Sequence, residues 1–347
     1  MNVKNHIVLK SVSVKDALTR LNFLSSNAVL FIVDKNEKLI GSVTDGDIRR
    51  GLIKGLNLTN SILDFASTSP RTLLANQYNQ LQIASYRRKN LQIVPIVDQD
   101  DKIIDLLNFS TQKSFLPLHA VIMAGGEGKR LRPMTLTTPK PLIEIGGKPI
   151  IEYNIDRLRA YGICNLTISV NYLGDLVKEK YKNGQTKNMN ISYIEEDIPL
   201  GTIGAIKKLS NIKSDYVLVM NSDILTNIDF EKLFNIFYSS KADIIVATTP
   251  YQVDIPYGVI ETNNEDIIGL KEKPTYTYYS NAGIYIFKKE LINLIPDKGA
   301  YNATDLLDNA IKQKFKIVHY TILGYWLDIG KPQDYIKAQR DIHNIKF

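Results

Sequence analysis

The chain has 347 residues, which predicts about two domains because one domain usually has roughly 100 to 200 residues. Hydrophobic residues make up 44% of the sequence and charged residues 23%, as expected of a globular protein with a packed core. No apolar run is long enough to predict a membrane span, and a single cysteine excludes an internal disulfide framework and predicts a cytoplasmic location. The formal net charge of +7 suits phosphorylated small molecules, but without a long basic block it does not predict binding to nucleic acid or membranes.

Residues 1–113 contain a weak internal repeat. The run NAVLFIVDKNEKLIGSV corresponds to LQIVPIVDQDDKIIDLL, and each consists of a β-rich run, a polar turn and a second β-rich run. A stretch with helical spacing precedes each copy, VKDALTRLNFLS in the first and NQYNQLQIASYRRK in the second. Two such helix-and-hairpin units predict a small α+β domain, followed by a linker over residues 114–118.

This first domain resembles a tandem CBS pair, also called a Bateman module, and the segment GSVTDGDIRRGL carries the resemblance. In that family a Gly-x-x-Thr-x-x-Asp pattern places the threonine near a ligand phosphate and the aspartate on the ribose hydroxyls, and Gly41, Thr44 and Asp47 match it. The second copy departs from the pattern at Asp105 and Asn108, so the resemblance implies one site, for an adenosine or guanosine nucleotide. Thr and Asp at these positions equally suit the N-terminal cap of a helix.

From residue 119 onward the sequence alternates between strands and helices. The β-rich runs are HAVIMA, NLTISVN, DYVLVMN and ADIIVAT, and the predicted helices include IIEYNIDRLRAYG and GTIGAIKKL. This alternation predicts an α/β domain over residues 119–347 with a largely parallel sheet. The loop after the first strand leaves the carboxyl end of that strand, where open α/β sheets bind ligands.

That loop combines glycines with basic residues. The residues concerned are Gly125, Gly126, Gly128, Lys129, Arg130, Arg132 and, further along, Lys140. Glycines let backbone N–H groups approach an oligophosphate, and the cationic side chains neutralise it. Met123 stands where a Walker A loop needs its first glycine, and Leu131 where a dinucleotide fingerprint needs its third. The loop therefore predicts a phosphate-binding site of another kind.

The whole string GGEGKRLRPMTLTTPKPL closely resembles the signature of sugar-nucleotide pyrophosphorylases, which are nucleotidyltransferases acting on sugar 1-phosphates. Further segments of that family follow in order: PLGTIGAI, VMNSDIL, PYGVIE, KEKP, NAGIYIF and WLDIGKPQDY. The resemblance covers nearly all of residues 119–347 and implies a Rossmann-like, GT-A-like mixed sheet with helices on both faces. It also implies that a sugar 1-phosphate oxygen attacks the α-phosphate of a nucleoside triphosphate and that pyrophosphate leaves.

The resemblance implies roles for individual residues. Asp223 and Asp328 match the two metal-binding aspartates for Mg²⁺, although Ser222 stands where the family commonly has glycine. Arg130 is implied to hold the triphosphate, and Lys140 to contact phosphates near the reacting centre. The implied nucleotide-binding residues are Gly125, Gly126, Gly128, Lys129, Glu196, Gly201 and Thr202. The implied sugar 1-phosphate pocket contains Gly258, Glu272, Lys273 and Asn281.

Glu196 lies where related enzymes place a residue that reads the base. A carboxylate only accepts hydrogen bonds, so it suits the adjacent N1–H and N2–H₂ donors of guanine. The neighbouring Glu195 has the same chemistry and is the alternative. The local string also resembles that of mannose-1-phosphate guanylyltransferases, and we therefore predict GTP as the nucleotide.

These observations predict a Mg²⁺-dependent guanylyltransferase of a hexose 1-phosphate, which we also expect to be a homo-oligomer. The fused architecture resembles the glucosamine-1-phosphate guanylyltransferases of legionaminic acid biosynthesis. Mannose 1-phosphate is the alternative sugar, and uridylyl or thymidylyl transfer is the alternative reaction. A catalytically silent, nucleotide-sensing regulatory subunit is an alternative of another class. The intact set Arg130, Lys140, Asp223, Lys273 and Asp328 argues against it, because a silent subunit has no chemical need for all five.

Overall fold

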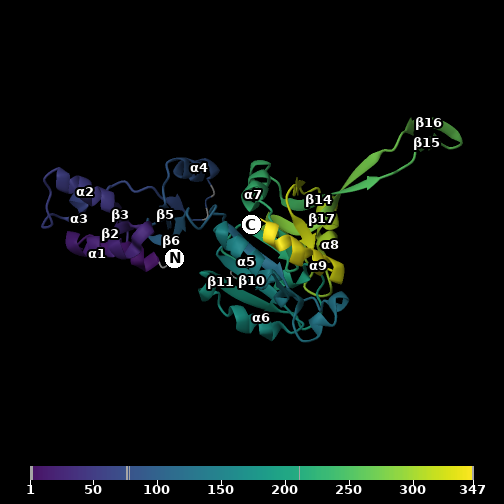
Figure 1. The fold of residues 1–347 in the computed structure, drawn as a ribbon, viewed down its shortest axis with the longest axis horizontal. Helices are drawn as coiled ribbons and strands as arrows, with labels where there is room; N and C mark the ends of the chain where they lie inside the picture. The colour runs from purple at the N-terminus through teal and green to yellow at the C-terminus, as the bar shows by residue number, and fades with distance from the viewer. Residues whose placement is uncertain (1–2, 76, 78, 211, 346–347) are drawn as a thin grey trace. The chain divides into compact units, whose positions relative to one another are not determined.

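The computed structural model describes residues 3–75, 77, 79–210 and 212–345 (Figure 1). It divides into two compact units. One contains the chain up to Pro117 together with Arg159–Ile163, and the other contains Leu118–Leu158 and the chain from Cys164 onward. Among the described helices, none has both the length and the apolar character needed to cross a membrane.

The first unit is built from two three-stranded sheets with the same topology. The first sheet consists of β1 (Ile7–Leu9), β2 (Val29–Val33) and β3 (Leu39–Thr44), and the second of β4 (Leu73–Leu74), β5 (Ile93–Val97) and β6 (Ile103–Asn108). In each sheet the central strand pairs in parallel with the first strand and antiparallel with the third. The internal repeat of the sequence is therefore present in the backbone pairing.

A helix precedes the central strand of each sheet, as the helical spacing predicts. The helices of this unit are α1 (Val14–Leu24), α2 (Asp45–Ile53), α3 (Ile62–Phe65) and α4 (Gln80–Arg88). Helix α1 buries Val14, Ala17 and Leu21, one helix face at three- and four-residue spacing, in a core shared with β2 and β3. Asn76 and Tyr78, which belong to the second predicted helical stretch, lie outside the described residues.

The second unit contains a seven-stranded mixed sheet in the order β11-β10-β7-β12-β17-β14-β18. Its strands are β7 (Leu118–Met123), β10 (Asn165–Val170), β11 (Asn190–Glu195), β12 (Tyr216–Asn221), β14 (Ile244–Asp254), β17 (Thr275–Lys288) and β18 (Ile317–Thr321). Strand β17 runs antiparallel to its neighbours β12 and β14, and the other neighbouring pairs are parallel. The predicted mixed α/β sheet is therefore confirmed.

Helices cover both faces of this sheet. They are α5 (Ile150–Ala160), α6 (Gly174–Tyr181), α7 (Phe230–Ser239), α8 (Ala303–Lys312) and α9 (Pro332–Asp341). Val217 of β12 shares a buried cluster with Leu306 of α8, whereas the ring of Tyr216 lies 5.5 Å from that of Phe234 in α7. Successive residues of a strand point to opposite faces, so α8 and α7 lie on opposite sides of β12.

One predicted helix is different in the structure. The segment GTIGAIKKL forms only a short 3₁₀ helix, Gly204–Lys208, rather than an α-helix. Gly201 precedes it at φ +79°, and a β-carbon there would lie 2.6 Å from the carbonyl oxygen of Tyr301. This close backbone approach holds the segment as a tight turn, which prevents an α-helix from starting at Gly201.

Strands β14 and β17 extend well beyond the sheet. Strand β14 pairs with β18 only as far as Thr248, but its ladder with β17 continues to the pair Asp254 and Thr275. Beyond that pair, β15 (Val259–Asn263) and β16 (Asp266–Lys271) form a two-stranded hairpin. Figure 1 shows β15 and β16 at the end of a long projection, and we call residues 249–280 the arm.

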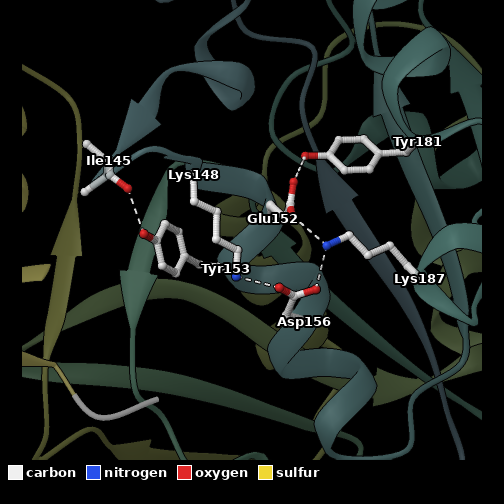
Figure 2. A network of polar contacts seen from close by, with 7 residues as sticks. All are labelled: Ile145, Lys148, Glu152, Tyr153, Asp156, Tyr181 and Lys187. Atoms are coloured by element: carbon white, nitrogen blue, oxygen red, sulfur yellow. Dashed lines mark hydrogen bonds and ion pairs between the residues drawn. The ribbon is translucent and has the colours of Figure 1, made fainter. Parts of the chain in front are cut away.

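A polar network fixes α5 to the neighbouring segments (Figure 2). The Nζ of Lys187 lies 2.6 Å from Oε1 of Glu152 and 3.0 Å from Oδ1 of Asp156, and Lys148 contacts the other oxygen of Asp156. The hydroxyl of Tyr181 donates to Glu152 over 3.3 Å, and burial raises the pKa of Tyr181, so this donor stays protonated. Each charge meets an opposite charge or a donor, and the network therefore has a structural role.

Candidate active site

A cavity of about 500 Å³ opens in the second unit at the carboxyl ends of parallel strands. Met123 ends β7, Asn221 ends β12, and Asn171 directly follows β10, and all three line the cavity. Glu196 directly follows β11 and lines it as well. The cavity therefore lies at the edge of the sheet where the fold class predicts a ligand site.

The glycine-rich loop forms one wall of the cavity. A β-carbon at position 125 would lie 2.8 Å from Oε1 of Glu196, so Gly125 is required for this close approach. Gly128 adopts φ +64°, and a β-carbon there would lie 2.8 Å from the side chain of Thr135. Leu131 is fully buried and anchors the far end of the loop. The loop backbone is thus held against the cavity, as the phosphate-binding prediction requires.

Glu196 and Glu195 have different environments. Glu196 is only 9% exposed, and its carboxylate accepts from the hydroxyl of Ser169 over 2.5 Å and from the N–H of Leu200 over 3.0 Å. The Glu195 side chain is 67% exposed and lies 2.8 Å from Nζ of Lys178, outside the residues that line the cavity. The structure therefore places Glu196 in the cavity and Glu195 outside it.

Asp223 and Asp328 come together although they are far apart in the sequence. The short strands β13 (Ile224–Thr226) and β19 (Trp326–Asp328) pair so that Ile224 lies opposite Asp328. Oδ2 of Asp223 contacts Nζ of Lys140. Burial, followed by the nearby Asp223 carboxylate, raises the pKa of Asp328 to about 6. The carboxylates of Asp223 and Asp328 therefore lie close together in a largely buried position at the edge of the cavity.

The free oxygens of this pair fit a hard divalent cation. Oδ1 of Asp223 and Oδ1 of Asp328 are both buried and have no hydrogen-bond partner among the described residues. Buried carboxylate oxygens normally have partners, so these two oxygens fit a bound cation. Among the residues the structure describes, no three His, Cys, Asp or Glu side chains are grouped so that they could hold a metal ion by themselves. A cation here would therefore complete its shell with phosphate oxygens and water, as Mg²⁺ commonly does.

Three cationic side chains line the cavity: Lys129, Arg130 and Lys140. The guanidinium of Arg130 passes so close to Gly330 that a β-carbon there would lie 3.1 Å from Nη2. Lys129 lies 3.2 Å from Glu127, and Lys140 contacts Asp223. The cavity is therefore suited to an anion, although acidic neighbours offset two of its three cations.

The predicted residues separate into two groups. Those that line the cavity are Gly125, Gly126, Gly128, Lys129, Arg130, Lys140, Glu196, Gly201, Thr202 and Asp223, with Asp328 beside them. The structure does not bring the four predicted sugar-phosphate residues to this cavity. Gly258, Glu272 and Lys273 lie on the arm, and the Asn281 amide oxygen accepts from the N–H of Gly283 and the hydroxyl of Tyr285.

Sequence reasoning missed several lining residues. Asn171 and Asn221 end the runs NLTISVN and DYVLVMN, so their position at the carboxyl ends of parallel strands was a usable signal. Pro199 and Leu200 also line the cavity, in the loop held by Glu196. No sequence pattern predicted Gly330 as a lining residue, because the reason for a glycine there is the Arg130 side chain, which packs against it only in the folded chain.

A glycine-rich loop and an acidic pair meet at the carboxyl edge of an α/β sheet, and residues 119–345 match the Nucleotidyl transferase family. The chain belongs to this family. It is 29% identical over 229 residues to the mannose-1-phosphate guanylyltransferase of Mycobacterium tuberculosis, covering 64% of each chain. It is 33% identical over 231 residues to the D-glycero-α-D-manno-heptose 1-phosphate guanylyltransferase of Aneurinibacillus thermoaerophilus, covering 65% of this chain and 99% of the relative.

A solved structure supports the same fold. A Bacillus anthracis protein, assigned as a glucose-1-phosphate thymidylyltransferase and solved with a sucrose, superposes with a TM-score of 0.54 at 26% identity. The superposition covers 66% of this chain and 97% of the other. The family match concerns the second unit, and the chain spans just under two thirds of the length of the mannose 1-phosphate relative.

Proposed function

We propose that the chain transfers a guanylyl group from GTP to a hexose 1-phosphate, giving a GDP-sugar and pyrophosphate. The observation that carries this proposal is the cavity itself, where the phosphate loop, the acidic pair and the buried Glu196 carboxylate meet. The names of the guanylyltransferase relatives support guanine as the base. One cysteine in the sequence supports a reducing location such as the cytoplasm.

In this reaction an oxygen of the sugar 1-phosphate forms a bond to the α-phosphorus, and the bond from that phosphorus to the bridging oxygen breaks. Pyrophosphate leaves with the electron pair. No residue is needed as a general base, because a phosphomonoester with a second pKa of about 6 is largely a dianion at neutral pH. Catalysis then depends on positioning two anions and neutralising their charge, which Arg130 and Lys140 do in the cavity.

Asp223 and Asp328 would hold Mg²⁺ through their unmet oxygens. When bound, the ion neutralises charge on the phosphate oxygens. Lys140 keeps Asp223 in place through their contact. Ser222 is buried and its N–H donates to the carbonyl of Met123 over 3.1 Å, which fixes the backbone beside Asp223.

Glucosamine 1-phosphate is our proposed sugar, on the resemblance of the two-part architecture to the legionaminic acid enzymes. Mannose 1-phosphate is the alternative sugar, and the name of the Mycobacterium tuberculosis relative supports it. The test is a matrix of GTP, UTP, dTTP and ATP against glucosamine, N-acetylglucosamine, mannose and glucose 1-phosphates, read by pyrophosphate release. If pyrophosphate is released only with UTP or dTTP, the base is a pyrimidine and not guanine. If no substrate pair releases pyrophosphate, the result favours a silent regulatory subunit.

Glu196→Gln is expected to lower kcat/KM for GTP by about tenfold or more and to narrow the preference for GTP over UTP. The carboxylate can accept from guanine donors with its remaining lone pairs, whereas a glutamine N–H₂ facing those donors leaves them unpaired, at about 1 to 3 kcal/mol per lost contact. Steady-state kinetics with both nucleotides measure the effect.

Glu195→Gln is the matched control for this prediction. It makes the same chemical change one residue away, on a side chain that points to Lys178 and does not line the cavity. The ratio of its kcat/KM for GTP to its kcat/KM for UTP should stay within about twofold of the wild-type ratio. An equal loss for both nucleotides in Glu196→Gln would instead assign Glu196 to holding the loop at Leu200.

For the first unit, we propose that the CBS-like fold binds one nucleoside phosphate. A cavity of about 450 Å³ in this unit includes Thr44 and Arg71 among its lining residues, whereas Gly41 and Asp47 do not line it. Thr44 caps α2, and the Asp47 carboxylate accepts from Thr44 and contacts Arg50. Both the cap and the cavity are thus present at the matched pattern.

Asp47→Ala is expected to weaken binding of AMP or GMP to the whole chain by roughly tenfold, because it removes the hydrogen bond that fixes the lining residue Thr44. Asp64→Ala is the matched control, since Asp64 forms the same type of capping box with Ser61 at α3 and does not line the cavity. Calorimetric titration of both variants measures this. Equal affinity in the two variants would contradict the proposed site.

A further inference from the structure

The stem of the arm is an amphipathic ribbon. Tyr251 pairs with Tyr278 and Val253 with Tyr276, so these four side chains share one face of the ladder. On the other face, Gln252 pairs with Thr277 and Asp254 with Thr275, while nearer the sheet Pro250 pairs with Tyr279, whose ring lies 5.1 Å from that of His319. An antiparallel ladder with one apolar and one polar face normally packs its apolar face against another layer.

In the described residues no such layer covers the arm. Tyr251 is 62% exposed, Tyr278 59% and Val253 37%. At the tip, Ile260 and Leu270 form an apolar cross-strand pair and are 52% and 68% exposed. A two-stranded hairpin by itself is marginally stable in water, and apolar patches of this kind mark interaction surfaces.

The arm cannot serve the cavity of its own chain in this geometry. Strand β17 lies beside the cavity at Gly283, where a β-carbon would lie 2.7 Å from Nδ2 of the lining residue Asn221. From Asn281 outward the ladder is unbroken to Thr275, so at about 3.3 Å per residue these two lie roughly 20 Å apart. Lys273 lies further out still, several times the length of a lysine side chain away.

The cavity, for its part, needs further positive charge. The proposed reaction brings a triphosphate and a sugar phosphate together, and two of the three lining cations already face Glu127 or Asp223. On the arm, Lys273 adopts φ +43°, a left-handed conformation, directly before Pro274. Both features restrict the backbone at this position, so the turn that leads into β17 fixes where Lys273 lies on the arm.

We infer that the arm is exchanged between two copies of this chain: the apolar faces of two arms pack together, and Lys273 of each copy reaches the cavity of the other. A twofold pair is the natural occupant, because a single amphipathic face is complementary to itself across a twofold axis. The contribution of Lys273 rests on the proposed function, whereas the association of the arms does not.

The association is tested by measuring the mass of the full chain in solution by light scattering. The wild type is expected to have twice the chain mass. Tyr251→Lys combined with Tyr278→Lys should yield the monomer, because it places four like charges in the interface. Gln252→Lys combined with Thr277→Lys adds the same charge to the opposite face and should leave the dimer intact. A monomeric wild type, or a dimer that survives both pairs of changes, would overturn the inference.

The shared site is tested by mixing two inactive chains, Lys273→Ala and Asp223→Ala, in co-expressed mixed dimers. In each mixed dimer one cavity has an intact acidic pair and receives an intact Lys273. Random pairing makes about half of the dimers mixed, so the mixture should recover about a quarter of wild-type pyrophosphate release. If each arm serves its own chain, the mixture should recover nothing, which would overturn the shared site.

The association of the arms can be tested independently of the proposed function, whereas the contribution of Lys273 cannot. If the wild type releases no pyrophosphate with any substrate pair, the proposed reaction and with it the Lys273 contribution are wrong, while the light-scattering result still decides whether the arms associate. Circular dichroism of both lysine pairs checks folding, which should persist because the substituted side chains lie outside the buried core.

Discussion

Asp223→Asn is expected to slow pyrophosphate release by about a thousandfold or more, a loss of roughly 4 kcal/mol of transition-state stabilisation. The amide carries no charge and keeps one oxygen, so it removes half of the charge of the acidic pair in the proposed cation site. Asp328→Asn should have a similar effect, because both carboxylates belong to that proposed site. The measurement is kcat with the best substrate pair from the matrix, at saturating Mg²⁺.

Folding and activity should separate in this experiment. Asp328→Asn removes a buried charge whose Oδ1 has no partner among the described residues, so its melting temperature in chelator should equal or exceed that of wild type. Asp175→Asn is the control, since that side chain is 94% exposed on α6 and should change kcat by less than about twofold. Near-native turnover in a folded Asp223→Asn or Asp328→Asn chain would remove both residues from the site.

The second large effect is expected at Arg130. Arg130→Ala should lower kcat/KM for GTP by about a thousandfold, the order expected when an arginine that stabilises phosphoryl-transfer charge is lost. Arg130→Lys should recover only part of this, because an ammonium group lacks the planar fork that binds two phosphate oxygens at once. The packing of the guanidinium against Gly330 also depends on its flat shape.

Arg132→Ala provides the comparison for Arg130. Its side chain is 46% exposed, lies 3.5 Å from Glu127 and does not line the cavity, so kcat/KM should stay within about threefold of wild type. Pre-steady-state measurement of pyrophosphate release distinguishes a slower chemical step from slower product release. Equal effects of the two alanine variants would mean that the loop acts only through its overall charge.

The sequence by itself determined the local chemistry of this protein. The alternation of β-rich and helical runs predicted the α/β unit, because strand and helix periodicities are properties of neighbouring residues. The phosphate loop was equally visible, since its glycines and cations are adjacent in the chain and most of them line the cavity. The repeat of the first unit could also be predicted, because each copy is a hairpin formed by neighbouring residues.

Only the tertiary structure decided which distant residues meet. Glu195 and Glu196 have the same chemistry, but only Glu196 packs against Gly125 and accepts from Ser169. The pairing of β13 with β19 brings the two aspartates together, and the unbroken β14–β17 ladder carries Lys273 away from its own cavity. Such placements depend on strand pairing between residues far apart in the chain, which a local pattern does not encode.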